Sequence, residues 1–190
     1  MKRLAATVVL SLLSLVAASP AWARECEDVT MPDSVTVDGT RLVLNGMGVR
    51  EATALQVNVY VAGLYVESRS RDGNAIASSD TRRRLVLHFV RDVSRADIVG
   101  AFNEGFGHSG QAGALRAQIR QLTGWMADMH EGEKLTFTYV PSTGLTVQVG
   151  RRTRGTIAGA AFAQAFFGIW LGAHPPNAGL RTGLLGGQCG

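Results

Sequence analysis

Two consecutive apolar stretches decide the fold class: RLVLNGMGVR at residues 41–50 and QVNVYVAGLYV at residues 56–66. Both are rich in valine, which favours strands, and the short segment 51–54 between them indicates a turn. Together they predict a β-hairpin. Since side chains alternate across a strand, Asn58 and Tyr60 are expected on one face and Val59 on the other.

The rest of the chain continues with strands and then with helical periodicity. Further strands are expected at 84–90, 134–140 and 145–150, with a turn at 141–144. Apolar spacing predicts helices at about 95–106, 115–129, 157–171 and 177–185, the first capped by Ser94. The run 157–171 is too short to span a bilayer comfortably and is interpreted as a buried helix. The expected fold class is α+β.

The N-terminus has the pattern of a secretory signal peptide. Lys2 and Arg3 precede about fifteen mostly apolar residues, and Ala21-Trp22-Ala23 offers small residues where a signal peptidase cuts. Cleavage after Ala23 gives a signal peptide at 1–23 and one domain at 24–190, located in the periplasm or secreted. An uncleaved membrane anchor is the alternative, but the apolar run is short for it. No stable membrane span is expected after cleavage.

The two cysteines of the chain, Cys26 and Cys189, lie near opposite ends. In an oxidising compartment they are expected to pair, and closing so long a loop stabilises by about 4–5 kcal/mol in the chain-entropy model. A metal site and a reactive thiol are the alternatives. Neither cysteine has a histidine near it in sequence.

The charge and the missing motifs exclude several classes of protein. Removing Lys2 and Arg3 with the signal peptide lowers the formal net charge from +4 to +2, so nucleic acid is not an expected partner. No histidine pair has zinc spacing and no glycine-rich nucleotide loop is complete, so neither a metal nor a cofactor is expected. The basic runs 82–84 and 151–154 are interpreted as solvated strand edges.

Polar residues interrupt the apolar strands, and Arg50 is the most informative of them. A guanidinium at the mouth of an apolar sheet suits a carboxylate, because its fork donates two parallel hydrogen bonds. The alternative is a structural salt bridge with Glu51 or Glu67, which the residues alone favour. The polar residues on the predicted strands are Asn45, Arg50, Asn58, Tyr60, Tyr65 and His88.

The order of these segments resembles the chalcone isomerase-like family, specifically its secreted bacterial branch. The resemblance rests on residues 44–50, 59–66, 85–90, 155–159 and 167–172 and covers nearly all of the chain after the signal peptide. It implies an open-faced sandwich, in which helices cover one face of a large antiparallel sheet and a ligand cleft lies between the layers.

Plant members of that family either cyclise chalcones without a cofactor or bind fatty acids in the same cleft. Arg50 matches the arginine of the family, and Tyr60 resembles the tyrosine that joins it in holding a fatty-acid carboxylate. The hydroxyls that the isomerases use fall at residues 96–98 and at Ile169, where this chain has none. Asn103 matches the isomerase asparagine.

The resemblance therefore favours a non-catalytic binder of a small amphipathic ligand, a carboxylate or a phenol. Arg50 and Tyr60 are the leading site residues, and Tyr65, His88 and Asn103 are weaker ones. A cofactor-independent isomerase using Arg50 and a structural envelope partner are the alternatives. A simple hairpin turning at 51–54 places Arg50 opposite Leu55, which leaves Tyr60 about 16 Å along the strand.

Overall fold

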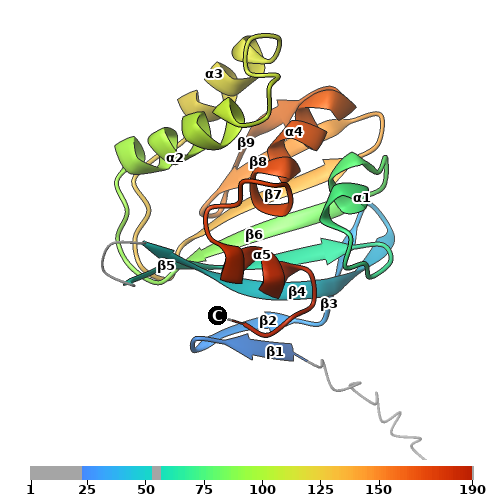
Figure 1. Ribbon diagram of the computed structural model, residues 1–190, viewed down its shortest axis with the longest axis vertical. Coiled ribbons are helices and arrows are strands. Elements are labelled where there is room, and N and C mark those ends of the chain that lie inside the picture. Colours follow the sequence, from blue (N-terminus) through green and yellow to red (C-terminus); the bar gives the residue numbers. More distant parts are fainter. Residues whose placement is uncertain (1–22, 53–56, 190) are drawn as a thin grey trace, which may run out of the picture.

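The computed structural model describes residues 23–52 and 57–189. Seven antiparallel strands form one curled sheet in simple chain order (Figure 1). They are β3 (Ser34–Val37), β4 (Thr40–Ala52), β5 (Val57–Val66), β6 (Arg83–Phe89), β7 (Lys134–Val140), β8 (Gly144–Val149) and β9 (Arg152–Ile157). A separate hairpin of β1 (Ala23–Cys26) and β2 (Val29–Pro32) lies against the outer face of the sheet.

Helices cover the inner face of the sheet (Figure 1). They are α1 (Gly73–Ser78), α2 (Arg95–Gly107), α3 (Arg116–Gly124), α4 (Ala160–Leu171) and α5 (Ala178–Leu184). Helix α2 begins where the sequence predicts, because the Ser94 hydroxyl accepts the Asp97 N–H at 3.2 Å. Helix α4 is buried over most of its length between the sheet and the other helices.

Two apolar cores follow from this arrangement. The larger one lies between the inner face of the sheet and the helices, and the smaller one lies between the outer face and the β1–β2 hairpin. The predicted α+β open-faced sandwich is confirmed. The hairpin covers part of the face that the sequence analysis left open.

Several predicted boundaries were wrong. Strand β4 continues to Ala52, and Ile157 ends strand β9 instead of beginning helix α4. Strand β9 was missed because it is an edge strand whose arginines face solvent, so it lacks the apolar alternation of a covered strand. Helix α3 ends at Gly124, and the apolar stripe continues in a loop whose Met129 exchanges two backbone hydrogen bonds with Val93. Strands β1–β3 and helix α1 were not predicted.

Helix α5 lies directly on strand β4. Gly46 and Gly48 permit this contact, since a Cβ atom at either position would overlap the backbone of α5. Beyond the helix, Cys189 forms a disulfide with Cys26 of β1, and their Cα atoms are 5.8 Å apart. Apart from Ala23, the predicted signal peptide lies outside the described residues. Among residues 23–52 and 57–189, no helix is both long and apolar enough to cross a bilayer.

The basic run 82–84 is not a solvated edge throughout, because the Arg83 side chain is only 1% exposed. Its guanidinium lies between the rings of Tyr139 and Phe167, 4.6 Å from each centroid. It also donates to the backbone carbonyls of Ala77, Ser79 and Thr81 at 2.5–3.1 Å. Arg83 therefore holds the last turn of α1 and the segment after it against the sheet.

Candidate functional site

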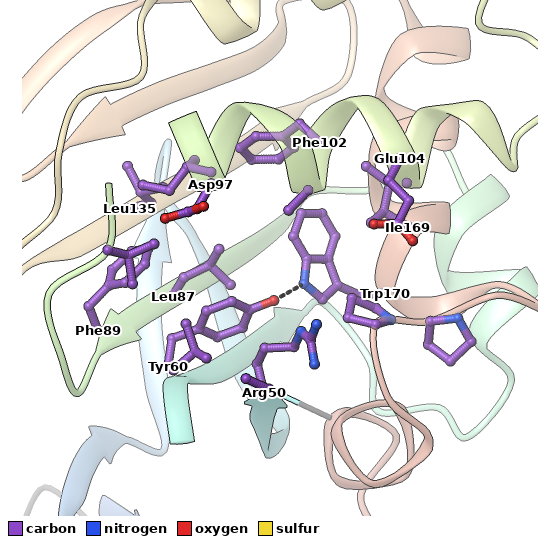
Figure 2. A pocket seen from close by; sticks show the side chains of 18 of the residues that line it. Arg50, Tyr60, Leu87, Phe89, Asp97, Phe102, Glu104, Leu135, Ile169 and Trp170 are labelled. Carbon is purple, nitrogen blue, oxygen red and sulfur yellow. Dashed lines mark hydrogen bonds between the residues drawn. The ribbon is translucent and has the colours of Figure 1, made fainter. Parts of the chain in front are cut away.

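A cavity of about 810 Å³ lies between the inner face of the sheet and the helices (Figure 2). Strands β4–β7 form its floor, α2 and α4 form its roof, and residues 173–178 border one side. Most of the wall is apolar. Apart from Tyr60, its larger aliphatic and aromatic members are Val59, Leu87, Phe89, Val93, Ile98, Phe102, Leu135, Ile169 and Trp170.

Arg50 and Tyr60 are cross-strand neighbours on the floor of this cavity. They are paired in the β4–β5 ladder, and directly opposed residues of an antiparallel pair share a face. The predicted separation of about 16 Å was wrong for two reasons. Strand β4 runs two residues past Arg50, and Val59 is an extra residue in β5 that shifts the register.

Tyr60 is held by two aromatic partners. The Trp170 indole Nε1 donates to the Tyr60 hydroxyl at 3.0 Å, and the Phe89 ring meets the Tyr60 ring edge-on at 5.8 Å. Burial raises the pKa of Tyr60 to about 12, although the Trp170 hydrogen bond and the Arg50 charge both act to lower it. The phenol is therefore protonated at neutral pH.

The Arg50 guanidinium points toward Tyr60 and Trp170 (Figure 2). One of its nitrogens donates to the backbone carbonyl of Glu51. Glu67 is engaged by Arg82, with the carboxylate 3.7 Å from the guanidinium. Within the described part of the chain, Arg50 forms no salt bridge with Glu51 or Glu67. The structural ion pair that the sequence favoured is therefore not formed.

Acidic side chains line the opposite wall of the cavity, near α2. The Asp97 carboxylate accepts the Ser94 hydroxyl at 2.6 Å, and Asp92 lies 3.4 Å from His130. Backbone and side-chain hydrogen bonds from Glu131 and His130 lower the pKa of Asp92. Figure 2 shows Asp97 and Glu104 on the helix side, with Arg50 on the sheet side. Arg91, which also lines the cavity, places a second cation next to Asp92.

The weaker predicted site residues do not join Arg50 and Tyr60. Tyr65 and His88 lie on the outer face of the sheet, since their neighbours Leu64 and Leu87 belong to the inner core. Tyr65 is opposite Arg84 and only 2% exposed. Asn103 lies on the exposed side of α2. None of these three side chains lines the cavity.

Asn45 and Asn58, the other polar strand residues, have structural roles. The Asn45 amide donates to the carbonyls of Ser70 and Leu184 at 2.9 and 2.7 Å. Asn58 donates to the Glu27 carboxylate at 3.0 Å, beside the β1–β2 hairpin. The sequence placed Asn58 on the same face as Tyr60, which was wrong because the extra residue Val59 reverses the alternation between them.

Comparison with known proteins identifies the family. A model of chalcone isomerase-like proteins matches residues 23–186. The chain belongs to the chalcone isomerase-like family. A solved structure of a fatty-acid binding protein from Arabidopsis thaliana is similar, with 15% sequence identity and a TM-score of 0.69. The match covers 83% of this chain and 92% of that one, and at this identity it shows the fold alone. No curated protein matches the sequence significantly.

Sequence reasoning missed the role of Trp170 in this chalcone isomerase-like site, where it bonds Tyr60. The residue was treated as part of a buried apolar helix, and it is indeed only 3% exposed. The sequence nonetheless indicated that Trp170 has a distant partner. A buried indole N–H needs a hydrogen-bond acceptor, and an apolar helix offers few acceptor side chains nearby. Its acceptor, Tyr60, is 110 residues away in sequence, so the pairing needs the fold.

Proposed function

We propose that this protein is a non-catalytic periplasmic or secreted binder of a small amphipathic acid, such as a fatty acid. The observation that carries the proposal is the cross-strand pairing of Arg50 and Tyr60 inside a largely apolar cavity. Both groups donate hydrogen bonds, and Arg50 carries a positive charge. An anionic oxygen is the group that satisfies both.

The charges of the cavity wall favour one orientation of such a ligand. Arg50 lies beside the Tyr60 hydroxyl, so two donors can hold an anionic oxygen there, whereas Arg91, the other arginine of the wall, is followed directly by Asp92. The head group is therefore expected at Arg50. The apolar tail then runs along Leu87, Phe102 and Leu135, whose carbon surface matches a hydrocarbon chain. A volume of about 810 Å³ falls within the usual range of ligand pockets.

The same wall argues against cyclisation as the function. Among the described residues that line the cavity, Tyr60 carries the only hydroxyl. Chalcone isomerases, in the mechanism that the resemblance implies, use several hydroxyls to stabilise a developing enolate. One such donor contributes about 3 kcal/mol to a transition state, so their replacement by apolar side chains removes much of the electrostatic catalysis. Binding of an acid needs only the donors of Arg50 and Tyr60 and the apolar wall of the cavity.

The fatty-acid binding activity named for the Arabidopsis structure agrees with this proposal. The disulfide between Cys26 and Cys189 agrees with an oxidising compartment. Mass spectrometry of protein exported by its natural N-terminus tests the location, with an N-terminus at Arg24 as the expected result. Full-length protein in the cytoplasm would contradict it.

The decisive experiment is calorimetric titration of delipidated mature protein with saturated fatty acids of increasing chain length. We expect binding that Arg50→Ala weakens at least tenfold, because a hydrogen bond to a charged group contributes about 1.5–3 kcal/mol. Arg152→Ala removes the same charge from the exposed edge strand and is the matched control. Equal weakening in both variants indicates a general effect of charge and contradicts the site. Absence of binding at every chain length, or chalcone turnover that needs Arg50, contradicts the proposed function.

A further inference from the structure

The Trp170–Tyr60 hydrogen bond controls what the head-group end of the cavity can recognise. An indole N–H can only donate, so at 3.0 Å the Tyr60 oxygen must be the acceptor. The phenol hydrogen is then directed elsewhere. Arg50, the charged neighbour of Tyr60, has no lone pair to accept it, so the hydrogen is left for a group inside the cavity.

Trp170 is firmly placed for this role. Its ring packs against Phe102, Phe137 and Phe166, with centroids 5.0–6.5 Å apart. Phe102 lies on α2 and Phe137 on β7, whereas Phe166 belongs to the same helix as Trp170, so two other elements fix the direction of the indole N–H. The Tyr60 ring is fixed in turn by Phe89. Neither partner of the hydrogen bond is free to rotate away without disturbing the core.

We infer that Trp170 is a positioning residue that directs the Tyr60 hydroxyl hydrogen into the cavity and competes for its oxygen, and thereby sets the preference of the head-group site for an acid over an alcohol. The inference rests on the proposed function and concerns its selectivity. An acid accepts from both Tyr60 and Arg50. An alcohol of the same length can use its oxygen as an acceptor, but its hydroxyl hydrogen has to share the Tyr60 oxygen with the Trp170 N–H, which already bonds it at 3.0 Å.

The test compares dodecanoic acid with dodecanol in wild type and in Trp170→Phe. Wild type is expected to prefer the acid. In Trp170→Phe the Tyr60 oxygen becomes free to accept from the alcohol, so the ratio of the two affinities falls about fivefold, the equivalent of one neutral hydrogen bond. Trp125→Phe is the matched control, because Trp125 packs on Gly155 of strand β9 and does not line the cavity. Its ratio should equal that of wild type.

A second measurement keeps the inference testable if Trp170→Phe does not fold. In ¹⁵N-correlated NMR spectra, the Trp170 indole N–H signal should move upfield in Tyr60→Phe, which removes its acceptor, and the Trp125 signal should not move. An unmoved Trp170 signal, or an unchanged acid-to-alcohol ratio in folded Trp170→Phe, overturns the role of Trp170 while leaving the proposed function standing. Wild type that binds neither probe overturns both.

Discussion

Replacing both Cys26 and Cys189 with serine should destabilise the protein strongly without changing its cavity. The disulfide joins residues 163 apart in sequence, so it restricts nearly the whole unfolded chain. For a loop of this length, the chain-entropy relation gives about 5 kcal/mol at about 25 °C. This is a large fraction of the 5–15 kcal/mol by which ordinary domains are stable.

Helix α5 has anchors that do not depend on the disulfide. Leu180 and Leu184 are fully buried, and Asn177 donates to the Val49 carbonyl at 3.0 Å just before the helix. Residues 173–178 should therefore keep their place at the border of the cavity. In folded Cys26→Ser/Cys189→Ser protein, the affinity for dodecanoic acid is expected to stay within twofold of wild type.

Equilibrium unfolding in guanidinium chloride measures the first effect, and calorimetry under native conditions measures the second. Wild type treated with reductant is the control, since it should reproduce the stability of the double variant. A loss below about 1 kcal/mol would refute the reasoning about the unfolded chain. A tenfold loss of affinity in folded protein would refute the claim that α5 is held independently.

Two further predictions concern buried side chains away from the ligand. Arg83→Lys keeps the charge but loses the planar guanidinium that donates to three carbonyls. Urea unfolding should therefore show a free energy of unfolding lower by about 3 kcal/mol. An unchanged midpoint would contradict the role given to Arg83. Burial raises the pKa of Tyr65 from about 10 to about 12, so its contribution of about 3 kcal/mol is present below pH 10 and disappears as the pH rises to 12. The free energy of unfolding should therefore fall less steeply in Tyr65→Phe than in wild type over that range, and parallel curves would show that Tyr65 is not the cause.

Much of the fold could be predicted because local signals and tertiary structure agree. The strands predicted at 134–140 and 145–150, the Ser94 cap and the buried helix predicted at 157–171 each have a pattern that a few neighbouring residues in the sequence are enough to show. The elements that were missed lack such a pattern. Strand β9 has arginines along an exposed edge, and β1 and β2 are only four residues long.

The site was predictable in its residue types but not in its geometry. An arginine and a tyrosine on apolar strands indicate a polar site, and both line the cavity. Tyr65 and His88 are also polar residues on apolar strands, but they lie on the other face. The difference between the two groups is which side of the sheet each residue faces. The face depends on how neighbouring strands are paired, and the sequence of one strand does not specify that pairing.

The register explains why Arg50 faces the cavity at all. Leu44 and Arg50 are six residues apart, so a regular strand would place them on the same face, yet Leu44 packs in the outer core. Asn45 is an extra residue without a partner in β5, so it reverses the alternation of faces along β4. From Gly46 onward, even-numbered residues of β4 face the cavity side instead of the outer side.

Asn45 is also the residue whose amide is bonded to Ser70 and Leu184, so the irregularity is fixed by contacts to the loop after β5 and to α5. If Asn45 were instead paired with Leu64 in a regular ladder, Arg50 would pair with Val59 and turn to the outer face, because a shift by one residue exchanges the two faces of a strand. Asn45, which the sequence showed only as a polar residue on a predicted strand, thus acts on the site from a distance, because its unpaired place in β4 decides which face of the sheet Arg50 occupies.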